Sequence, residues 1–274
     1  KISLERINEI HQSRNEESKN NQMKEFAGEK AIRINEISFR YDPHSLKKTL
    51  DNITFEIPEG KVTAIVGASG SGKTTLIKLM LGYYPVSEGA IMVSGKNINE
   101  YNLKWWRRCC GVVMQDGVIF SESIARNIAV GDSEVDIARL EQAARIACIH
   151  DYILSLPLKY NTKIGRDGVG LSQGQKQRIL IARAVYKNPV FIFLDEATNS
   201  LDAKNEREIV ENLDDFYKGR TVVVVAHRLS TVKNADQIVV IDSGKVVEKG
   251  THTELIEKQG GYFNLVKNQL ELGN

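Results

Sequence analysis

The sequence predicts an α/β fold with a mostly parallel core sheet, an antiparallel β flank and an inserted α-helical subdomain. An apolar run, a glycine-rich turn and a helical pattern follow one another between residues 62 and 81. Helical patterns then fill residues 116–189, and apolar strands alternate with helices from there to residue 249. Strands that alternate with helices are typical of a parallel sheet, whereas a separate block of helices indicates an insertion.

The chain has 274 residues, of which 42% are hydrophobic and 26% are charged, so it can form one large domain or two small ones. A formal net charge of +2 gives no reason to expect nucleic acid as a partner. The sequence contains no apolar run that could span a membrane, and it does not open with a signal peptide. Because it begins with Lys1 rather than methionine, we expect a piece of a longer polypeptide. The neighbours Cys109 and Cys110 lack the spacing of a metal site and are expected to be packing residues.

Residues 1–30 are predicted to be a helix end followed by a linker, because Leu4, Ile7 and Ile10 have helical spacing before a charged stretch. Alternating apolar and polar residues predict the early strands. We assign the early strands other than the central one at 62–66 to the antiparallel flank. Helical spacing predicts the helices, of which the last is a single amphipathic helix. The predicted strands are residues 31–41, 50–57, 62–66, 90–93, 111–114, 190–195, 221–226, 236–241 and 245–249, and the predicted helices are residues 75–81, 123–130, 136–147, 173–187, 204–217 and 253–270.

The segment Gly67–Thr74 fits the phosphate-binding pattern G-x-x-x-x-G-K-[ST] and lies between a strand and a helix, as this motif requires. Its glycines let backbone N–H groups turn toward a phosphate, and the helix N-terminus adds partial positive charge. Lys73 would reach the β- and γ-phosphates, and the Thr74 hydroxyl would hold Mg²⁺. We therefore predict a nucleoside triphosphate ligand rather than a plain glycine turn. The predicted binding residues here are Gly67, Ala68, Ser69, Gly70, Ser71, Gly72, Lys73, Thr74 and Thr75.

Two apolar strands end in side chains that suit hydrolysis. Asp195 and Glu196 close the strand at 190–195, and ligands bind at the carboxyl ends of strands in open parallel sheets. Asp195 suits the water shell of Mg²⁺, and Glu196 could orient and deprotonate the water that attacks the γ-phosphate. His227 ends the strand at 221–226 and could hold that water or donate to the phosphate. Without the phosphate loop, such residues would be interpreted as solvated or capping groups.

Gln115 follows the strand at 111–114, and its amide could reach the metal or the attacking water. In the segment LSQGQ, Ser172 is a natural N-cap and Gly174 lets a phosphate approach the first helical turn. A capped helix alone would explain this segment. A second anion-binding helix end beside a complete phosphate loop instead predicts a ligand shared with another copy of the chain. The four remaining histidines, His11, His44, His150 and His252, are expected at the surface.

With these motifs, the chain resembles the nucleotide-binding domain of an ATP-binding cassette (ABC) transporter. The resemblance covers residues 31–269 and implies the P-loop NTPase fold, ATP hydrolysis with Mg²⁺, and an ATPase domain at 31–272 with a helical subdomain inserted at about 116–189. Its motifs stand in the family's order, which is Tyr41, the phosphate loop, Gln115, LSQGQ, VFIFLDE, the loop at 200–202 and His227.

The resemblance also implies how the nucleotide is held. Tyr41 would stack on adenine. Two copies would close head to tail around two ATP molecules, so that Ser172 and Gly174 of one copy touch the γ-phosphate held by Lys73 of the other. Asp202 would lie across that interface. ATP binding would close this homodimer, and hydrolysis would reopen it.

Residues 115–128 are similar to a sequence pattern of exporters. In that pattern an apolar-aromatic pair, here Ile119 and Phe120, packs near the membrane domain. Residues 1–11 resemble the cytoplasmic end of an exporter's last membrane helix. The resemblance thus implies an N-terminal membrane domain in the same polypeptide and a place on the cytoplasmic face of a bacterial membrane. Half-size exporters of peptides, bacteriocins or toxins, some of which carry an N-terminal cysteine peptidase, are the most similar group.

Two positions depart from the family's pattern. Gln173 gives LSQGQ where LSGGQ is usual, and Arg166 stands near the place where exporters often carry an acidic residue that meets the membrane domain. Because Ser172 and Gly174 are retained, we expect the contact with the other copy to survive, and only its strength beside the bulkier Gln173 stays open. The contact with the membrane domain near Arg166 also stays open. Two alternative functions are also open, namely an importer ATPase subunit made as a separate chain and a soluble ABC ATPase that acts on nucleic acid. The likeness of residues 1–11 to the end of a membrane helix argues against the importer subunit. The lack of a coiled-coil insertion or a second cassette argues against the soluble ATPase.

Overall fold

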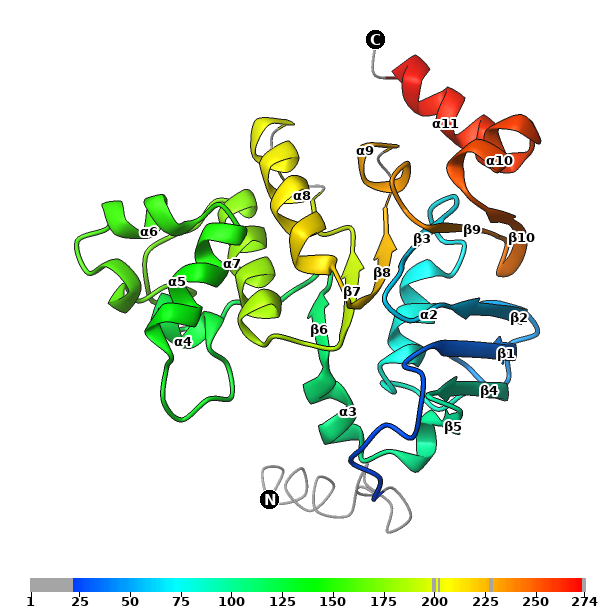
Figure 1. The fold of residues 1–274 in the computed structure, drawn as a ribbon, viewed down its shortest axis with the longest axis horizontal. Coiled ribbons are helices and arrows are strands. Elements are labelled where there is room, and N and C mark those ends of the chain that lie inside the picture. The colour runs from blue at the N-terminus through cyan, green and yellow to red at the C-terminus, as the bar shows by residue number, and fades with distance from the viewer. Residues whose placement is uncertain (1–21, 199–200, 202, 227–228, 273–274) are drawn as a thin grey trace.

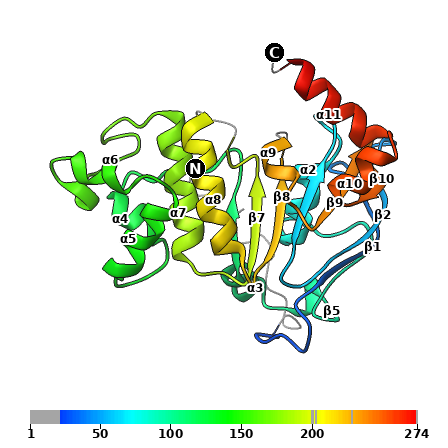
Figure 2. The same cartoon turned by 45° about the horizontal axis from the view of Figure 1, so that its top comes forward.

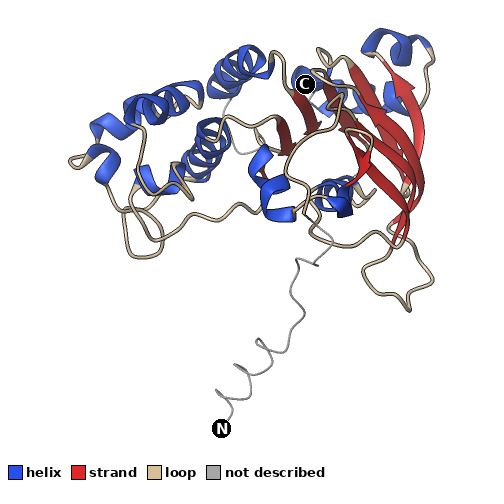
Figure 3. Ribbon diagram, turned by 60° about the horizontal axis from the view of Figure 1, so that its bottom comes forward, coloured by secondary structure: helices blue, strands red, loops and turns tan. Residues whose placement is uncertain are grey.

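The structure of the protein is a computed structural model that describes residues 22–198, 201, 203–226 and 229–272. Figure 1 shows a strand-rich part at one end of the molecule, a helical part at the other, and a sheet that runs between them. Figure 3 shows the same division, with curved strands on one side and a cluster of helices on the other. This arrangement confirms the predicted α/β fold class.

The predicted antiparallel flank is a four-stranded sheet in the order β2-β1-β4-β5. Its strands pair antiparallel, with Ile32 opposite Ile57 on one side and opposite Val93 on the other. Apolar residues at alternate positions turn one face of this sheet toward the core. The four strands are β1 (Ile32–Phe39), β2 (Leu50–Ile57), β4 (Glu88–Val93) and β5 (Lys96–Asn97).

The core sheet has six strands in the order β10-β9-β3-β8-β7-β6. All neighbours pair in parallel except β9 and β10, and Figure 2 shows β7 and β8 running side by side in the same direction. Every residue of β7 and β8 is buried, which is why both strands are continuous apolar runs in the sequence. The strands are β3 (Val62–Val66), β6 (Cys110–Val113), β7 (Phe191–Asp195), β8 (Thr221–Val225), β9 (Gln237–Asp242) and β10 (Lys245–Gly250).

Two strand assignments from the sequence are wrong. The strand predicted at 111–114 is β6, which pairs in parallel with β7 at the edge of the core sheet and does not belong to the flank. The strand predicted at 245–249 is β10, which is antiparallel to β9. Only Ser243 and Gly244 separate these two strands, and both have positive φ, of 49° and 78°. A two-residue turn of this kind folds a hairpin, whereas parallel strands need a long crossover.

The helical part lies between β6 and β7 in the chain, as predicted for an insertion. Side-chain caps start several of its helices, because Ser123, Asp136 and Ser172 each accept a hydrogen bond from a backbone N–H of the first turn. Its elements are α4 (Ile124–Ile128), α5 (Ile137–Ile146), α6 (His150–Ser155), the short 3₁₀-helix η2 (Lys159–Asn161) and α7 (Gln173–Tyr186). Outside it lie α2 (Lys73–Met80), η1 (Ile98–Glu100), α3 (Leu103–Cys109), α8 (Ala203–Tyr217), α9 (Leu229–Val232), α10 (His252–Glu257) and α11 (Gly261–Leu272).

The single helix predicted at 253–270 is two helices, α10 and α11. Gln259 has a φ of 51°, a left-handed conformation that ends the first helix, and Gly260 follows it. One histidine expectation is also wrong. His150 is only 5% exposed, and its Nδ1 lies 2.8 Å from the Tyr160 hydroxyl. Cys110, expected to be a packing residue, is fully buried.

The segment just before β1 packs on the folded part of the chain. The ring of Phe26 lies 4.8 Å from that of Trp105 and 5.6 Å from that of Phe191, between ring centroids. The amide of Gly28 donates a hydrogen bond of 2.9 Å to the Ser94 hydroxyl. Residues 1–21, the greater part of the predicted linker, lie outside the described residues, so the boundary at residue 30 stays a prediction. Among the helices that the structure describes, none has the length and apolar character of a membrane span.

Candidate nucleotide-binding and hydrolytic site

The candidate site lies at the carboxyl ends of the parallel strands. Ile65 of β3 and Asp195 of β7 both pair with Val225 of β8. The next pair along the sheet joins Leu194 to Val113 of β6. The glycine loop after β3, the acids after β7 and the segment after β6 therefore leave the sheet at one edge, as the sequence predicted.

The glycine loop needs glycine at particular positions. Gly67 has a φ of 150°, and a Cβ there would lie 2.0 Å from the carbonyl oxygen of Ile241 in the neighbouring strand β9. Gly72 has a φ of 106°, and a Cβ would lie 2.5 Å from Leu50 Cδ2. Gly72 also precedes α2 without a side-chain cap, so the first N–H groups of this helix are available to an anion.

Lys73 lies at the start of α2 and is only 5% exposed. Its Nζ donates to the carbonyl oxygens of Gly67 and Ala68, at 2.9 and 2.8 Å, so the cation lies within the loop. Burial lowers the pKa of Lys73, and the nearby carboxylates of Glu196 and Asp195 partly offset this effect. The lysine and the two acids therefore share one electrostatic environment.

Asp195 ends β7 and is 1% exposed. Neither of its carboxylate oxygens has a hydrogen-bond partner of standard geometry among the described residues. Burial raises its pKa, and the Thr74 hydroxyl and the charge of Lys73 partly offset that rise. A buried carboxylate whose hydrogen bonding is this incomplete is costly, and this cost is a reason to look for a bound cation.

Glu196 follows directly and is half-buried. Its φ is 54°, a left-handed conformation that is uncommon for a residue with a side chain, and its amide donates a 3.0 Å hydrogen bond to the carbonyl of Val225. This conformation turns the chain sharply at the end of β7. Strained backbone of this kind costs about 1–3 kcal/mol and is concentrated at functional sites.

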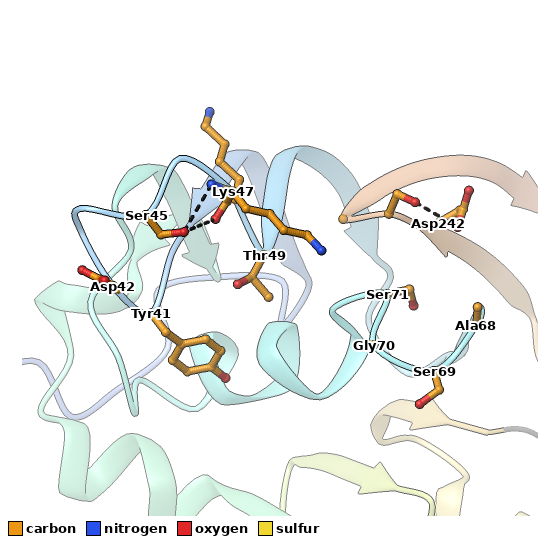
Figure 4. Close-up of a pocket in the computed structure, with 13 residues that line it drawn as sticks. Tyr41, Asp42, Ser45, Lys47, Thr49, Ala68, Ser69, Gly70, Ser71 and Asp242 are labelled. Carbon is orange, nitrogen blue, oxygen red and sulfur yellow. Dashed lines mark hydrogen bonds between the residues drawn. The ribbon is translucent and has the colours of Figure 1, made fainter.

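A cavity of about 590 Å³ opens beside the glycine loop. Figure 4 shows residues 41–49 on one side of it and the loop from Ala68 to Ser71, with the turn at Asp242, on the other. Polar side chains and backbone of three separate segments meet here, because the turn between β9 and β10 touches the loop through a 3.2 Å hydrogen bond from Gly244 N to Ser71 O. The cavity is of the size and place expected for a nucleotide.

Tyr41 lines this cavity with half of its side chain exposed. Its hydroxyl lies 3.1 Å from Thr75 Oγ1 on α2. Its ring packs edge-on against Phe39 and Tyr84, with ring centroids 5.0 and 5.3 Å apart. Tyr84 was not singled out from the sequence, where the pair Tyr83 and Tyr84 after the predicted helix was the available signal.

The remaining predicted residues lie elsewhere or outside the described chain. Gln115 is exposed and follows β6 at the same sheet edge. Ser172 is exposed at the start of α7, and its hydroxyl accepts a hydrogen bond of 3.2 Å from Gln175 N. Neither Ser172 nor Gly174 is among the described residues that line the cavity beside Tyr41. Asp202 and His227 lie outside the described residues.

A family model described as "ABC transporter" matches residues 50–199. The leukotoxin translocation ATP-binding protein LktB of Mannheimia haemolytica is 42% identical over 272 residues, which cover 99% of this chain and 38% of that protein. The protein of the same name from Bibersteinia trehalosi gives the same values. A solved structure of a bacterial Atm1-family ABC exporter with ATP bound has a TM-score of 0.91 at 33% identity, covering 98% of this chain and 47% of that one. The chain thus spans less than half the length of each relative.

The family model begins with β2, includes the glycine loop and ends just past β7, so it covers more than half of the chain, including Asp195 and Glu196. The resemblance inferred from the motifs is thereby confirmed. This chain belongs to the ABC transporter family.

Proposed function

We propose that this chain is the ATP-hydrolysing motor domain of an ABC exporter, and that two copies close around two ATP molecules to drive export. The relatives support this proposal, because one is named for toxin translocation and another is an exporter with ATP bound. From the first of these names we infer a peptide, bacteriocin or toxin as the exported substrate. The domain itself would extend from residue 31 to residue 272, with the helical subdomain at about 116–189.

The observation that carries the proposal is the buried carboxylate of Asp195 beside the glycine loop, whose oxygens have no hydrogen-bond partner of standard geometry among the described residues. Asp195 and Glu196 end a strand at the sheet edge where Lys73 lies, and the charges of all three groups interact. Lys73 would bind the β- and γ-phosphates, and Glu196 would orient the attacking water and accept its proton.

Mg²⁺ fits the residues present here. Thr74, Asp195 and Gln115 would hold the ion, because hydroxyl, carboxylate and amide oxygens are the ligands that it prefers. Both oxygens of Asp195 lack a described partner of standard geometry, which leaves them available for this role. When bound, the metal would neutralise charge that develops on the phosphates.

The base of ATP would lie on Tyr41. This tyrosine borders the cavity beside the glycine loop and has half of its side chain exposed, so a face of the ring is accessible to a planar ligand. Aromatic stacking tolerates any base, so we expect Tyr41 to add affinity with little selectivity.

The second half of each site would come from the partner copy. Ser172 is exposed and Gly174 is half-buried at the start of α7, and neither lines the cavity of its own chain, so this helix end is accessible to another copy. The Ser172 hydroxyl oxygen accepts from Gln175, and its proton remains for a γ-phosphate oxygen. Gln173 is exposed beside it and would lie at the same interface. Asp202 and His227 would complete the interface and the site.

A membrane domain would dock on the face that joins the core to the helical part. A cavity of about 240 Å³ there is lined by Arg107, Val130 and Lys187 among others. Val130 is 50% exposed, and Phe120 nearby in the chain is 47% exposed, so apolar side chains are accessible beside cations. The relatives are more than twice as long as this chain, which supports a further domain. Docking would place the chain on the cytoplasmic face of the membrane.

The head-to-tail arrangement is tested by mixing two inactive variants. Lys73→Ala removes the cation of the glycine loop, and Ser172→Ala removes the hydroxyl at the start of α7. In a mixed dimer, one site then combines both defects and the other is intact. If the dimer assembles freely, about half of the dimers are mixed, so we expect about a quarter of the wild-type ATPase rate.

The controls distinguish the head-to-tail arrangement from the motor function itself. Each variant alone should hydrolyse little ATP, and a mixture of Lys73→Ala with a Lys73→Ala, Ser172→Ala double variant should stay inactive. If the first mixture were also inactive although mixed dimers form, the head-to-tail arrangement would be contradicted. If the wild-type chain hydrolysed no ATP, the motor function itself would be wrong.

A further inference from the structure

Tyr84 contacts the tyrosine on which we place the base of ATP. Its ring centroid lies 5.3 Å from that of Tyr41, with an angle of 89° between the ring planes. Tyr84 also packs against Phe39, at 5.8 Å between centroids, and Phe39 packs edge-on against Tyr41. The three rings therefore form a closed cluster. The two pairs that Tyr41 makes are edge-to-face, an arrangement that is attractive and fixes the angle between the rings.

Helix α2 supports the position of Tyr41 at two points. Thr75, in the first turn of α2, is 3.1 Å from the Tyr41 hydroxyl. The chain after α2 is held to the last turn of the helix, because Tyr83 N donates to Lys78 O at 2.9 Å and Gly82 N donates to Leu79 O at 2.9 Å. Tyr84 follows directly, so its position depends on α2, the helix that begins with the phosphate-binding lysine.

Any effect of Tyr84 on the nucleotide would pass through Tyr41. It is 40% exposed, but it does not line the nucleotide cavity as the described residues delimit it, whereas Tyr41 does. The neighbouring Tyr83 has a different contact, because the guanidinium of Arg107 lies over its ring at 5.1 Å from the centroid. Two adjacent and similarly exposed tyrosines therefore face different partners, and Tyr84 is the one that packs on Tyr41.

We propose that Tyr84 is a positioning residue for nucleotide binding, which holds the Tyr41 ring in the orientation that stacks on the base. This inference rests on the proposed function of Tyr41. Without the Tyr84 ring, the half-exposed Tyr41 side chain gains rotamers, and ATP binding must then order it. The loss of one aromatic contact should weaken ATP binding by about three- to tenfold.

The test compares ATP with inorganic tripolyphosphate, which has no base, in the full-length protein. Tyr84→Ala should raise the Kd and the KM for ATP, leave kcat close to wild type, and leave tripolyphosphate binding unchanged. Tyr84→Phe should restore ATP affinity, since the ring contact needs no hydroxyl. Tyr83→Ala is the matched control and should leave the Kd for ATP unchanged. Tyr84→Leu, which removes the ring but keeps more apolar volume than alanine, provides a second variant if the alanine variant folds poorly, and it should also raise the Kd for ATP.

Two results would overturn the inference. One is unchanged ATP affinity in both Tyr84→Ala and Tyr84→Leu. The other is an equal loss for ATP and tripolyphosphate, because damage to the loop rather than to the base contact would weaken both. Failure of the proposed function is distinguishable. If Tyr41 did not stack on the base, Tyr41→Ala would leave the Kd for ATP unchanged, and if the motor function were wrong, the wild-type chain would hydrolyse no ATP.

Discussion

The ammonium nitrogen of Lys73 lies 2.9 Å from the carbonyl oxygen of Gly67, the residue that begins the same loop. A second hydrogen bond, of 2.8 Å, joins it to Ala68 O. The loop is thus folded around its own cation, and the side chain is buried although it carries charge. Asp195 and Glu196, at the end of β7, supply the opposite charge.

Replacing this cation should abolish tight ATP binding. Lys73→Ala removes the charge that we assign to the β- and γ-phosphates, and charge-assisted hydrogen bonds of this kind are worth about 1.5–3 kcal/mol each. We expect the Kd for ATP, measured by calorimetry, to rise by about a hundredfold. Lys61→Ala is the control, because Lys61 is exposed and pairs with Asp236. Equal ATP affinity in the wild type and Lys73→Ala would contradict the assignment.

The Gly67 position should not accept a side chain. A Cβ there would lie 2.0 Å from Ile241 O, which is backbone and cannot move aside cheaply. We expect Gly67→Ala to lower the free energy of unfolding by about 3 kcal/mol or more. Gly60→Ala is the matched control, because Gly60 also has a positive φ, of 65°, but has no atom within 4 Å of its ideal Cβ. It should cost about 1 kcal/mol in a urea titration. Equal losses would show that the close approach to β9 is unimportant.

Asp195 should lower stability at neutral pH in metal-free buffer. Burial raises its pKa above the ordinary value of 3.8, so the unfolded chain releases this proton at lower pH than the folded chain. Stability from this group therefore falls as pH rises from about 3.8 through the folded pKa. We expect Asp195→Asn to raise the free energy of unfolding at pH 7 by about 1 kcal/mol while it abolishes ATP hydrolysis.

The control for this prediction is a carboxylate with the opposite shift. Hydrogen bonds from Lys48 and Lys245 lower the pKa of Asp51. Asp51 contributes stability that is present above its ordinary value and is lost as pH falls through its folded pKa. Asp51→Asn should therefore not stabilise the chain at pH 7. If Asp195→Asn destabilised it instead, the carboxylate would have partners that offset its burial.

Much of this architecture could be predicted from the sequence, because its elements are specified locally. The strand, glycine loop and α2 carry their signals within twenty residues, and β7 and β8 are apolar runs that need no partner to be recognised. Sheet membership is different, since β6 resembles any short strand until β7 pairs with it. The hairpin of β9 and β10 depends on two positive φ values at Ser243 and Gly244, and these were not inferred.

The site shows the same division. The loop and the acids Asp195 and Glu196 follow from their order along the chain, because parallel strands bring their ends to one edge. Contacts between distant segments could not be predicted in this way. The packing of Tyr84 on Tyr41 joins positions 43 residues apart, and His150 is buried because Tyr160 folds back to meet it. Helix α3, with Trp105 and Trp106, was also missed, since its aromatic residues do not show a clear helical period.

The most direct test of the central claim is whether ATP makes the Glu196→Gln variant dimerise. Sedimentation in the presence of Mg²⁺ measures this. Glutamine keeps the shape of the side chain but cannot accept the proton of the attacking water, so hydrolysis should fall by about a hundredfold or more. ATP should then hold two copies together in a stable dimer, whereas Glu211→Gln, at an exposed position on α8, should behave like the wild type. A Glu196→Gln chain that hydrolyses ATP at the wild-type rate, or that stays monomeric with ATP, would contradict the account.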